Sequence, residues 1–203
     1  QYSRIQQREI GQPQIFDGVN ATQARAIIEQ AQQSGREILS AFEVYKIFEA
    51  YGIPVAPWNV ATDAEQAVAA ATEIGYPVVV KVDCAEIDHK SDMGGVAINL
   101  KDASEVRNIV AEMHERLGHF GKLGFLVQKF MPGGRELIIG ASAERELGHL
   151  VMFGLGGIYV EVLKDVIFKI APVTQVEAAE MLAGIKTSAL LDGVRGEAGI
   201  DKQ

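Results

Sequence analysis

Apolar and polar positions along the chain follow two patterns, and the change between them falls near residue 123. Before it, apolar residues recur three or four positions apart in segments that end at glycine, which is typical of amphipathic helices. Short apolar runs of strand length separate these segments. The pattern predicts helices over 20–34, 40–52, 62–75 and 103–117, and strands over 53–60, 78–82 and 96–100.

Capping residues support three of these helix starts. A Ser, Thr or Asp that is followed three positions later by Glu can satisfy the free backbone amides of a first helical turn. The pairs are Ser40 with Glu43, Thr62 with Glu65, and Asp102 with Glu105.

After residue 123, strand-like runs follow one another with only short turns between them, which predicts a mainly antiparallel arrangement. A last helix is expected over Gln175–Lys186. A helix-rich first half and a hairpin-rich second half indicate two small α+β lobes, and a cleft between lobes is a favoured place for a small ligand. The expected strands are Gly124–Phe130, Glu136–Ser142, His149–Phe153, Ile158–Leu163 and Val166–Ile170.

Composition narrows the function classes. With 19 Lys+Arg and 27 Asp+Glu, the net charge of −8 argues against a nucleic-acid partner. No apolar run approaches the ~18–20 residues of a membrane span, so no membrane partner is expected. Cys84 is the only cysteine, which favours a reducing compartment, the cytoplasm. Residues 1–19 are a predicted linker, and a start at Gln1 indicates a piece of a longer protein.

The segment after the predicted strand 78–82 carries the clearest candidate chemistry. Gly94 and Gly95 would let backbone amides approach phosphate oxygens, while Lys90 and Ser91 add a charge and a donor. It is not a P-loop, and a plain polar hairpin turn is the alternative. His89 in this loop has the chemistry of a nucleophile or an acid/base, or no function at all.

Other charged residues have a functional and a plain interpretation. Lys81 interrupts an apolar strand, so it either reaches an anion or pairs with a carboxylate. Glu161 and Asp165 follow a glycine-rich turn and offer oxygen ligands to a divalent cation, or form a charged hairpin face. Arg135 and Glu136 fit a hairpin ion pair. Zinc-site spacing and a Gly-x-Ser-x-Gly elbow are both absent from the sequence.

Five segments taken in order are far more specific than any one of them. Together they closely resemble the ATP-grasp domain of the NDP-forming acyl-CoA synthetases, the group of the ADP-forming acetyl-CoA synthetases and distant kin of succinyl-CoA synthetase. The resemblance covers about residues 15–200. The segments are EAYGIPV (49–55), GYPVVVK (75–81), HKSDMGGV (89–96), GRELIIG (134–140) and FGLGGIYVEVLKD (153–165).

The resemblance implies a function that the spacing alone does not show. The family interconverts acyl-CoA, ADP and phosphate with free acid, CoA and ATP, using Mg²⁺. A CoA-binding ligase part, on the same chain or a separate subunit, forms an acyl phosphate and phosphorylates a histidine. The histidine of the His-Lys-Ser-Asp segment, His89 here, then carries phosphate to ADP on a loop that swings between sites.

The resemblance also implies an ATP-grasp fold with a nucleotide between two lobes. Residues 58–127 would form the inserted lobe, and 20–57 would pack with 128–203. The residues that would bind the nucleotide are Lys81, Lys90, Ser91, Gly94, Gly95, Gln128, Lys129 and Glu136, with adenine near 127–130 and Glu161 a weaker metal candidate.

Two departures from the family pattern set up alternatives. Residues 83–88 read DCAEID where the family usually has Ser-Pro-Asp before the histidine segment. The family's closing Glu-(Ile/Leu)-x-x-Asn-Pro strand, which binds magnesium, does not follow residue 196, so a C-terminally truncated domain is expected. The alternative function is a non-catalytic, synthetase-like module of a protein lysine acetyltransferase. A carboxylate–amine ligase is argued against by the histidine segment.

Overall fold

A computed structural model describes residues 12–87, 90–193 and 198–201. Contacts within the chain divide it into two compact units, one formed by Asp17–Pro132 and one built on Gly133–Gln203. Each unit combines one antiparallel sheet with helices, so the predicted mixed α+β class is confirmed. The predicted grouping of 20–57 with 128–203 stays a prediction.

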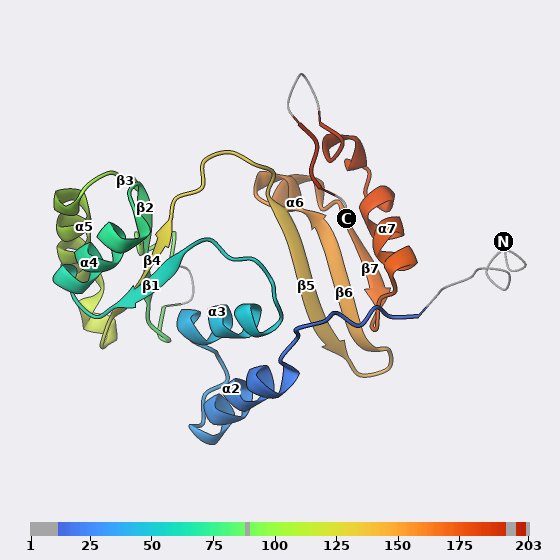
Figure 1. The fold of residues 1–203 in the computed structure, drawn as a ribbon, viewed down its shortest axis with the longest axis horizontal. Coiled ribbons are helices and arrows are strands. Elements are labelled where there is room, and N and C mark those ends of the chain that lie inside the picture. Colours follow the sequence, from blue (N-terminus) through green and yellow to red (C-terminus); the bar gives the residue numbers. More distant parts are fainter. Residues whose placement is uncertain (1–11, 88–89, 194–197, 202–203) are drawn as a thin grey trace, which may run out of the picture. The chain divides into compact units, whose positions relative to one another are not determined.

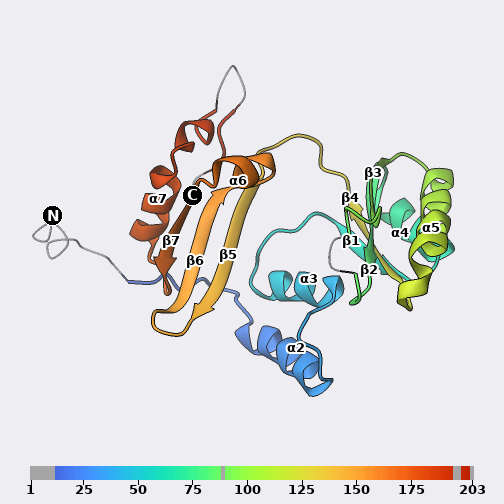
Figure 2. The same cartoon turned by 180° about the vertical axis from the view of Figure 1, so that it is seen from behind.

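The first unit is a four-stranded sheet with two helices on one face (Figure 1). The spatial order is β1-β4-β2-β3, and every neighbouring pair is antiparallel. Helices α4 (Ala64–Ile74) and α5 (Ala103–Leu117) cover the same side, as the reverse view also shows (Figure 2). The strands are β1 (Trp58–Ala61), β2 (Val78–Asp83), β3 (Val96–Leu100) and β4 (Gly124–Lys129).

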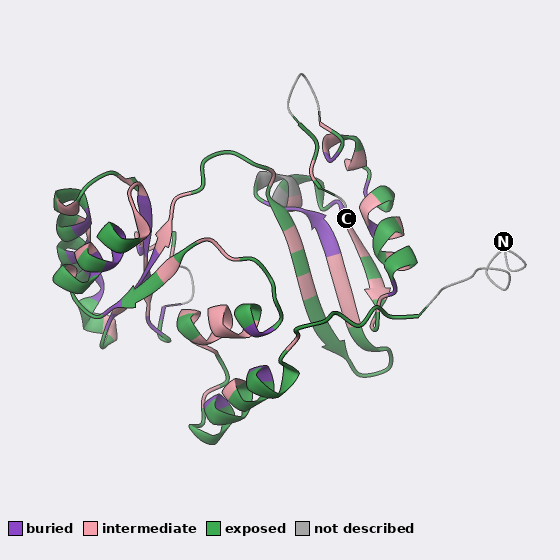
Figure 3. Cartoon of the chain, in the orientation of Figure 1, coloured by how far each residue is buried: buried purple, intermediate pink, exposed green. Residues whose placement is uncertain are grey.

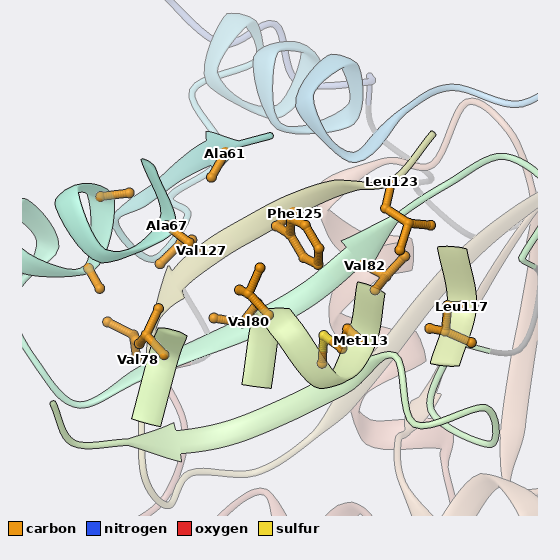
Figure 4. Packing of buried hydrophobic residues seen from close by; sticks show 14 of the residues in the cluster. Ala61, Ala67, Val78, Val80, Val82, Met113, Leu117, Leu123, Phe125 and Val127 are labelled. Carbon is orange, nitrogen blue, oxygen red and sulfur yellow. The ribbon is translucent and has the colours of Figure 1, made fainter. Parts of the chain in front are cut away.

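Strand alternation decides which residues of β2 enter the core. Val78, Val80 and Val82 are buried against the two helices, together with Phe125 of β4 and Met113 of α5 (Figure 4). Because successive side chains of a strand point to opposite faces, Lys81 and Asp83 lie on the other side of the sheet. The hydrophobic core therefore fixes the face on which the polar residues of β2 lie.

Helices α2 (Ala21–Gln33) and α3 (Ala41–Ala50) complete this unit. The predicted capping box of α3 is confirmed, with Ser40 and Glu43 bonding each other's backbone amides. Phe42 and Tyr45 of α3 place their rings 5.7 and 5.0 Å from that of Trp58. Helix α3 thus packs against β1.

The second unit has its own sheet and core. Strands β5 (Leu137–Glu144), β6 (Gly148–Leu155) and β7 (Val166–Ile170) form an antiparallel meander, with α7 (Gln175–Gly184) against it. Buried residues gather where helices meet sheets, as the purple segments show (Figure 3). Among the described residues, the 3₁₀ turn η2 (Ser188–Leu190) belongs to this unit and η1 (Gly118–Phe120) to the first unit. The buried core residues are Phe153, Leu155, Met181, Ile185 and Leu191.

One predicted strand is wrong. Residues 158–163 form a short helix, α6 (Ile158–Leu163), rather than a strand. Gly157 and Lys164 adopt positive φ angles of 57° and 48° at its ends. Strand β7 pairs directly with β6, with Val166 opposite Gly154, so α6 spans the connection between two paired strands.

Smaller boundary differences have local causes. The N-cap of α4 is Asp63, which accepts from the Gln66 amide, rather than Thr62. Where a strand was expected over 53–60, β1 begins at Trp58 and ends at Ala61, since the prolines before it cannot donate ladder hydrogen bonds. Within the described residues no helix is long and apolar enough to cross a membrane.

Candidate functional site

Lys81 and Gln128 meet on the sheet face opposite the helices. They come from neighbouring strands, with Val79 directly opposite Gln128 and Lys81 two residues further along β2. The Lys81 Nζ donates a hydrogen bond of 3.1 Å to Gln128 Oε1. The structure therefore brings together two residues that are 47 positions apart and that the sequence predicted as nucleotide ligands.

Tyr45 of α3 adds a third member that sequence analysis did not identify. Its hydroxyl is hydrogen-bonded to the Gln128 side chain. Burial raises the Tyr45 pKa, and the bond to Gln128 opposes that rise. Tyr45 lies on the apolar face of the predicted helix 40–52, and this position predicts a core residue rather than a site residue.

The charge on Lys81 is poorly compensated. Burial lowers its pKa first, and the nearby positive charge of Lys90 lowers it further. Gln128 contributes a neutral acceptor rather than a charge. Lys81 and Lys90 carry two positive charges against the one negative charge of Asp83, and this local excess of positive charge in a chain of net charge −8 suits an anion such as a phosphate.

Lys90 lies beside the end of β2. Its Nζ is 3.5 Å from Asp83 Oδ1, and its carbonyl accepts a hydrogen bond of 2.6 Å from the Gly95 amide. A side chain on Gly95 would come within 2.9 Å of that carbonyl oxygen, so the turn is closed too tightly for one. Gly94 has φ +69°, and the Arg116 guanidinium occupies the space where its Cβ would stand.

Arg116 is a second residue that sequence analysis did not identify. It projects from α5 and donates a hydrogen bond of 3.2 Å to the Gly94 carbonyl. Ser91, between Lys90 and Gly94, is exposed. Asp88 and His89, the predicted phosphate carrier, lie outside the described residues.

Lys129 does not join Lys81 and Gln128. It pairs with Val78 and so lies on the helix-covered side of β4. Its Nζ donates to the carbonyls of Gly75 and Tyr76 at 2.7 and 2.8 Å. Gly75 is the C-cap of α4, where carbonyls lack helical partners and attract a cation. A role of Lys129 at the nucleotide stays a prediction.

Glu136 belongs to the second unit, just before β5. It is exposed and lies against a tight backbone turn, where its carbonyl accepts a hydrogen bond of 2.7 Å from the Gly156 amide. Its carboxylate occupies the space where a Gly157 Cβ would stand. A cavity of about 350 Å³ opens here, lined by Gly134, Arg135, Glu136, Leu155, Gly156, Gly157 and Leu190.

The two acidic metal candidates differ. Glu161 lies in α6, and its side chain is outside the described part of the structure. Asp165 is buried, and its carboxylate accepts hydrogen bonds from the Lys186 amide and from the amide and hydroxyl of Thr187. Burial alone would raise the Asp165 pKa, but these hydrogen bonds outweigh it and the pKa is lowered. The Asp165 carboxylate therefore anchors the segment after α7.

A magnesium site does not emerge from the described residues, since they contain no group of three or more His, Cys, Asp or Glu side chains that could hold a metal ion.

Comparisons with known proteins identify the family to which this fold belongs. A family model described as an ATP-grasp domain matches residues 30–203. The 4-hydroxybutyrate–CoA ligase [ADP-forming] of Nitrosopumilus maritimus is 44% identical over 88% of this chain and 26% of its own length. The beta subunit of acetate–CoA ligase [ADP-forming] I of Pyrococcus furiosus is 43% identical over 86% of this chain and 76% of its own length. The chain thus spans about a quarter of the first relative and three quarters of the second.

Solved structures give the same result. Acetyl-coenzyme A synthetase 1 of Ca. Korarchaeum cryptofilum, in complex with coenzyme A, Ca-AMPCP and HgCl⁺, is similar with a TM-score of 0.83 and 39% identity, over 88% of this chain and 80% of that chain. In a second structure of that synthetase, with coenzyme A and Mg-AMPPCP, the phosphohistidine segment points towards the nucleotide binding site. That structure has a TM-score of 0.75 and 39% identity, over 88% of this chain and 78% of that chain.

Proposed function

Because this chain belongs to the ATP-grasp domains of the ADP-forming acyl-CoA ligases, we propose that it transfers a phosphoryl group between a phosphohistidine and ADP. The whole protein would be an acetate or other acyl-CoA ligase of the cytoplasm. Its CoA-binding ligase part would lie on the same chain or on a separate subunit.

His89 is the proposed phosphate carrier. In the direction of ATP formation, the bond between phosphorus and the imidazole nitrogen breaks while phosphorus bonds to a terminal oxygen of ADP. The imidazole leaves as the neutral ring after it takes up one proton from solvent. An imidazole suits this role because it is nucleophilic near neutral pH and is a good leaving group.

The observation that carries the proposal is the half-buried Lys81, hydrogen-bonded to Gln128 and close to the charge of Lys90. Phosphoryl transfer requires cations that neutralise phosphate charge more than it requires covalent chemistry. We assign Lys81 and Lys90 to phosphate oxygens. The further proposed nucleotide contacts are Ser91, Gly94, Gly95, Gln128, Lys129 and Glu136.

Mg²⁺, when bound with the nucleotide, neutralises phosphate charge. The described residues present no ligand cluster for it, so we assign it no residue, and Glu161 remains only a candidate.

The test uses the full-length ligase that contains this chain. After incubation with ATP and Mg²⁺, we expect acid-labile, base-stable phosphate on the peptide that contains His89. His89→Ala should abolish this phosphate and net ATP formation. His149→Ala is the control, because His149 is exposed on β6 and has no part in the proposal.

Mass spectrometry under alkaline conditions measures the result. If the intact enzyme turns over while that peptide never carries phosphate, the carrier role of His89 is wrong. If neither turnover nor phosphate is found, a non-catalytic module of an acetyltransferase becomes the better interpretation.

A further inference from the structure

The segment that contains the proposed phosphate carrier is bounded by two charged residues in contact. Asp83 is the last residue of β2, and Lys90 is the first described residue after His89. The Lys90 Nζ lies 3.5 Å from Asp83 Oδ1, and the two side chains are 32% and 19% exposed. This ion pair therefore joins the two charged residues on either side of positions 84–89.

Asp83 also contacts the N-terminus of α3. Both of its carboxylate oxygens lie 3.2 Å from the backbone amide of Ala41, the first residue of α3. A carboxylate at a helix N-terminus is favoured by the free amides and by the helix dipole. Because the N-terminus of α3 is already fixed by its capping box, Asp83 gains a rigid support.

The first half of the segment is anchored as well. Cys84 and Ile87 are buried in the core of the first unit, and the Ile87 amide donates a hydrogen bond to the Cys84 carbonyl. Lys90 is also held through its backbone, because its carbonyl accepts from the Gly95 amide and the Gly95 carbonyl in turn accepts from Val82. Asp83 is thus tied both to α3 and to Lys90, and the positive charge of Lys90 acts on Lys81.

We propose that Asp83 is a positioning residue for phosphoryl transfer: it links α3 to Lys90, the residue after the proposed carrier in the sequence, and so sets the place of the Lys90 ammonium near Lys81. This inference rests on the proposed function. Asp83 itself need not touch the phosphate, since a carboxylate would repel it. Its effect would be transmitted through Lys90, which lies close enough to Lys81 to influence its charge.

Asp83→Asn tests this in the full-length ligase. The amide oxygen can still accept the hydrogen bond from Ala41, so the substitution removes mainly the attraction to Lys90. We expect the rate at which ATP phosphorylates His89 to fall about fivefold, the upper range for a partly exposed ion pair. The melting temperature and the nucleotide affinity should stay near those of the wild type.

Glu86→Gln is the matched control, because it makes the same chemical change in the same segment. The Glu86 carboxylate accepts a hydrogen bond from the Cys84 thiol rather than pairing with Lys90. The control should keep the wild-type phosphorylation rate. In a Lys90→Gln background, Asp83→Asn should cause no further loss of rate, since the contact it removes is already gone.

The outcomes separate this inference from the function on which it rests. If wild-type His89 never carries phosphate, the proposed function fails and the inference with it. If wild-type His89 is phosphorylated and Asp83→Asn keeps the wild-type rate, only the inference is overturned. Two other results would also overturn the inference, because each would show a structural effect elsewhere. One is a slower phosphorylation rate in Asp83→Asn accompanied by a clear drop in its melting temperature. The other is a further loss of phosphorylation rate when Asp83→Asn is added to Lys90→Gln.

Discussion

Burial of Lys81 disfavours the positive charge that its proposed role in phosphate binding requires. Its pKa is lowered by burial and then by Lys90, so the unfolded chain holds this proton more tightly than the folded protein does. Its positive charge therefore reduces stability when no anion is bound, most fully below its folded pKa. Stability should rise as the pH increases through the folded pKa towards 10.5, the ordinary pKa of a lysine.

We predict that Lys81→Met lowers nucleotide affinity about 30-fold or more and leaves the melting temperature unchanged or higher. Met fits the strand and removes the half-buried charge without leaving a cavity. Calorimetry on the full-length protein measures both quantities, with the exposed Lys122→Met as control. A sharp drop in melting temperature with intact affinity would make Lys81 a structural residue.

The charge of Glu43, unlike that of Lys81, stabilises the folded protein. The hydrogen bond from Arg36 lowers the Glu43 pKa from 4.5 to about 2, burial opposes this, and hydrogen bonds from Ser40 add to it. A carboxyl group whose folded pKa is lowered stabilises the protein above pH 4.5, and this contribution is lost as the pH falls towards about 2.

Glu43→Gln should therefore reduce the free energy of unfolding at pH 7 by ~1–2 kcal/mol, after allowance for solvent screening of the partly exposed pair. The difference between variant and wild type should shrink as the pH is lowered from 4.5 towards 2. Urea denaturation across this range measures it. Glu65→Gln, which breaks an exposed pair with Arg107, should have a smaller effect; an effect as large as that of Glu43→Gln would contradict this account.

At the scale of elements, the segment around α6 marks where pattern reasoning fails. Ile158–Leu163 is apolar enough for a strand, yet β6 and β7 already pair with each other and leave no place for one between them. The turn before it depends on Gly157, whose φ of +57° and ψ of −144° few other residues adopt. This backbone conformation places Glu136 against Gly157.

We predict that Gly157→Ala destabilises the second unit by ~1–3 kcal/mol through backbone strain and also weakens nucleotide binding. The loss of affinity would arise because the new methyl group displaces the Glu136 carboxylate. Gly133→Ala is the control: its φ is also positive, at +74°, but no atom lies within 4 Å of the position of a Cβ. Equal nucleotide affinities in the two variants would show that the position of Glu136 is unimportant.

For the whole molecule, the sequence predicted the family, the α+β class and most elements, because helix caps and strand periods are local signals. It could have separated Gln128 from Lys129 as well, since neighbours in a strand face opposite sides. It could not predict that Asp83 meets α3 or that Tyr45 meets Gln128. Those contacts join residues 42 or more positions apart and depend on how α3 packs against the sheet.

The two units have separate cores that share no buried residue, one around Phe125 and Met113 and one around Phe153 and Met181. We predict that a cavity in one core loosens only its own unit. Leu191→Ala, at a fully buried position, should cost ~2–5 kcal/mol locally and speed hydrogen exchange in β6, β7 and α7, but not in β2 and β4. Leu117→Ala is the matched substitution in the first core and should give the reverse pattern. Hydrogen exchange read by mass spectrometry decides this, and faster exchange throughout the chain in both variants would show that the units unfold together.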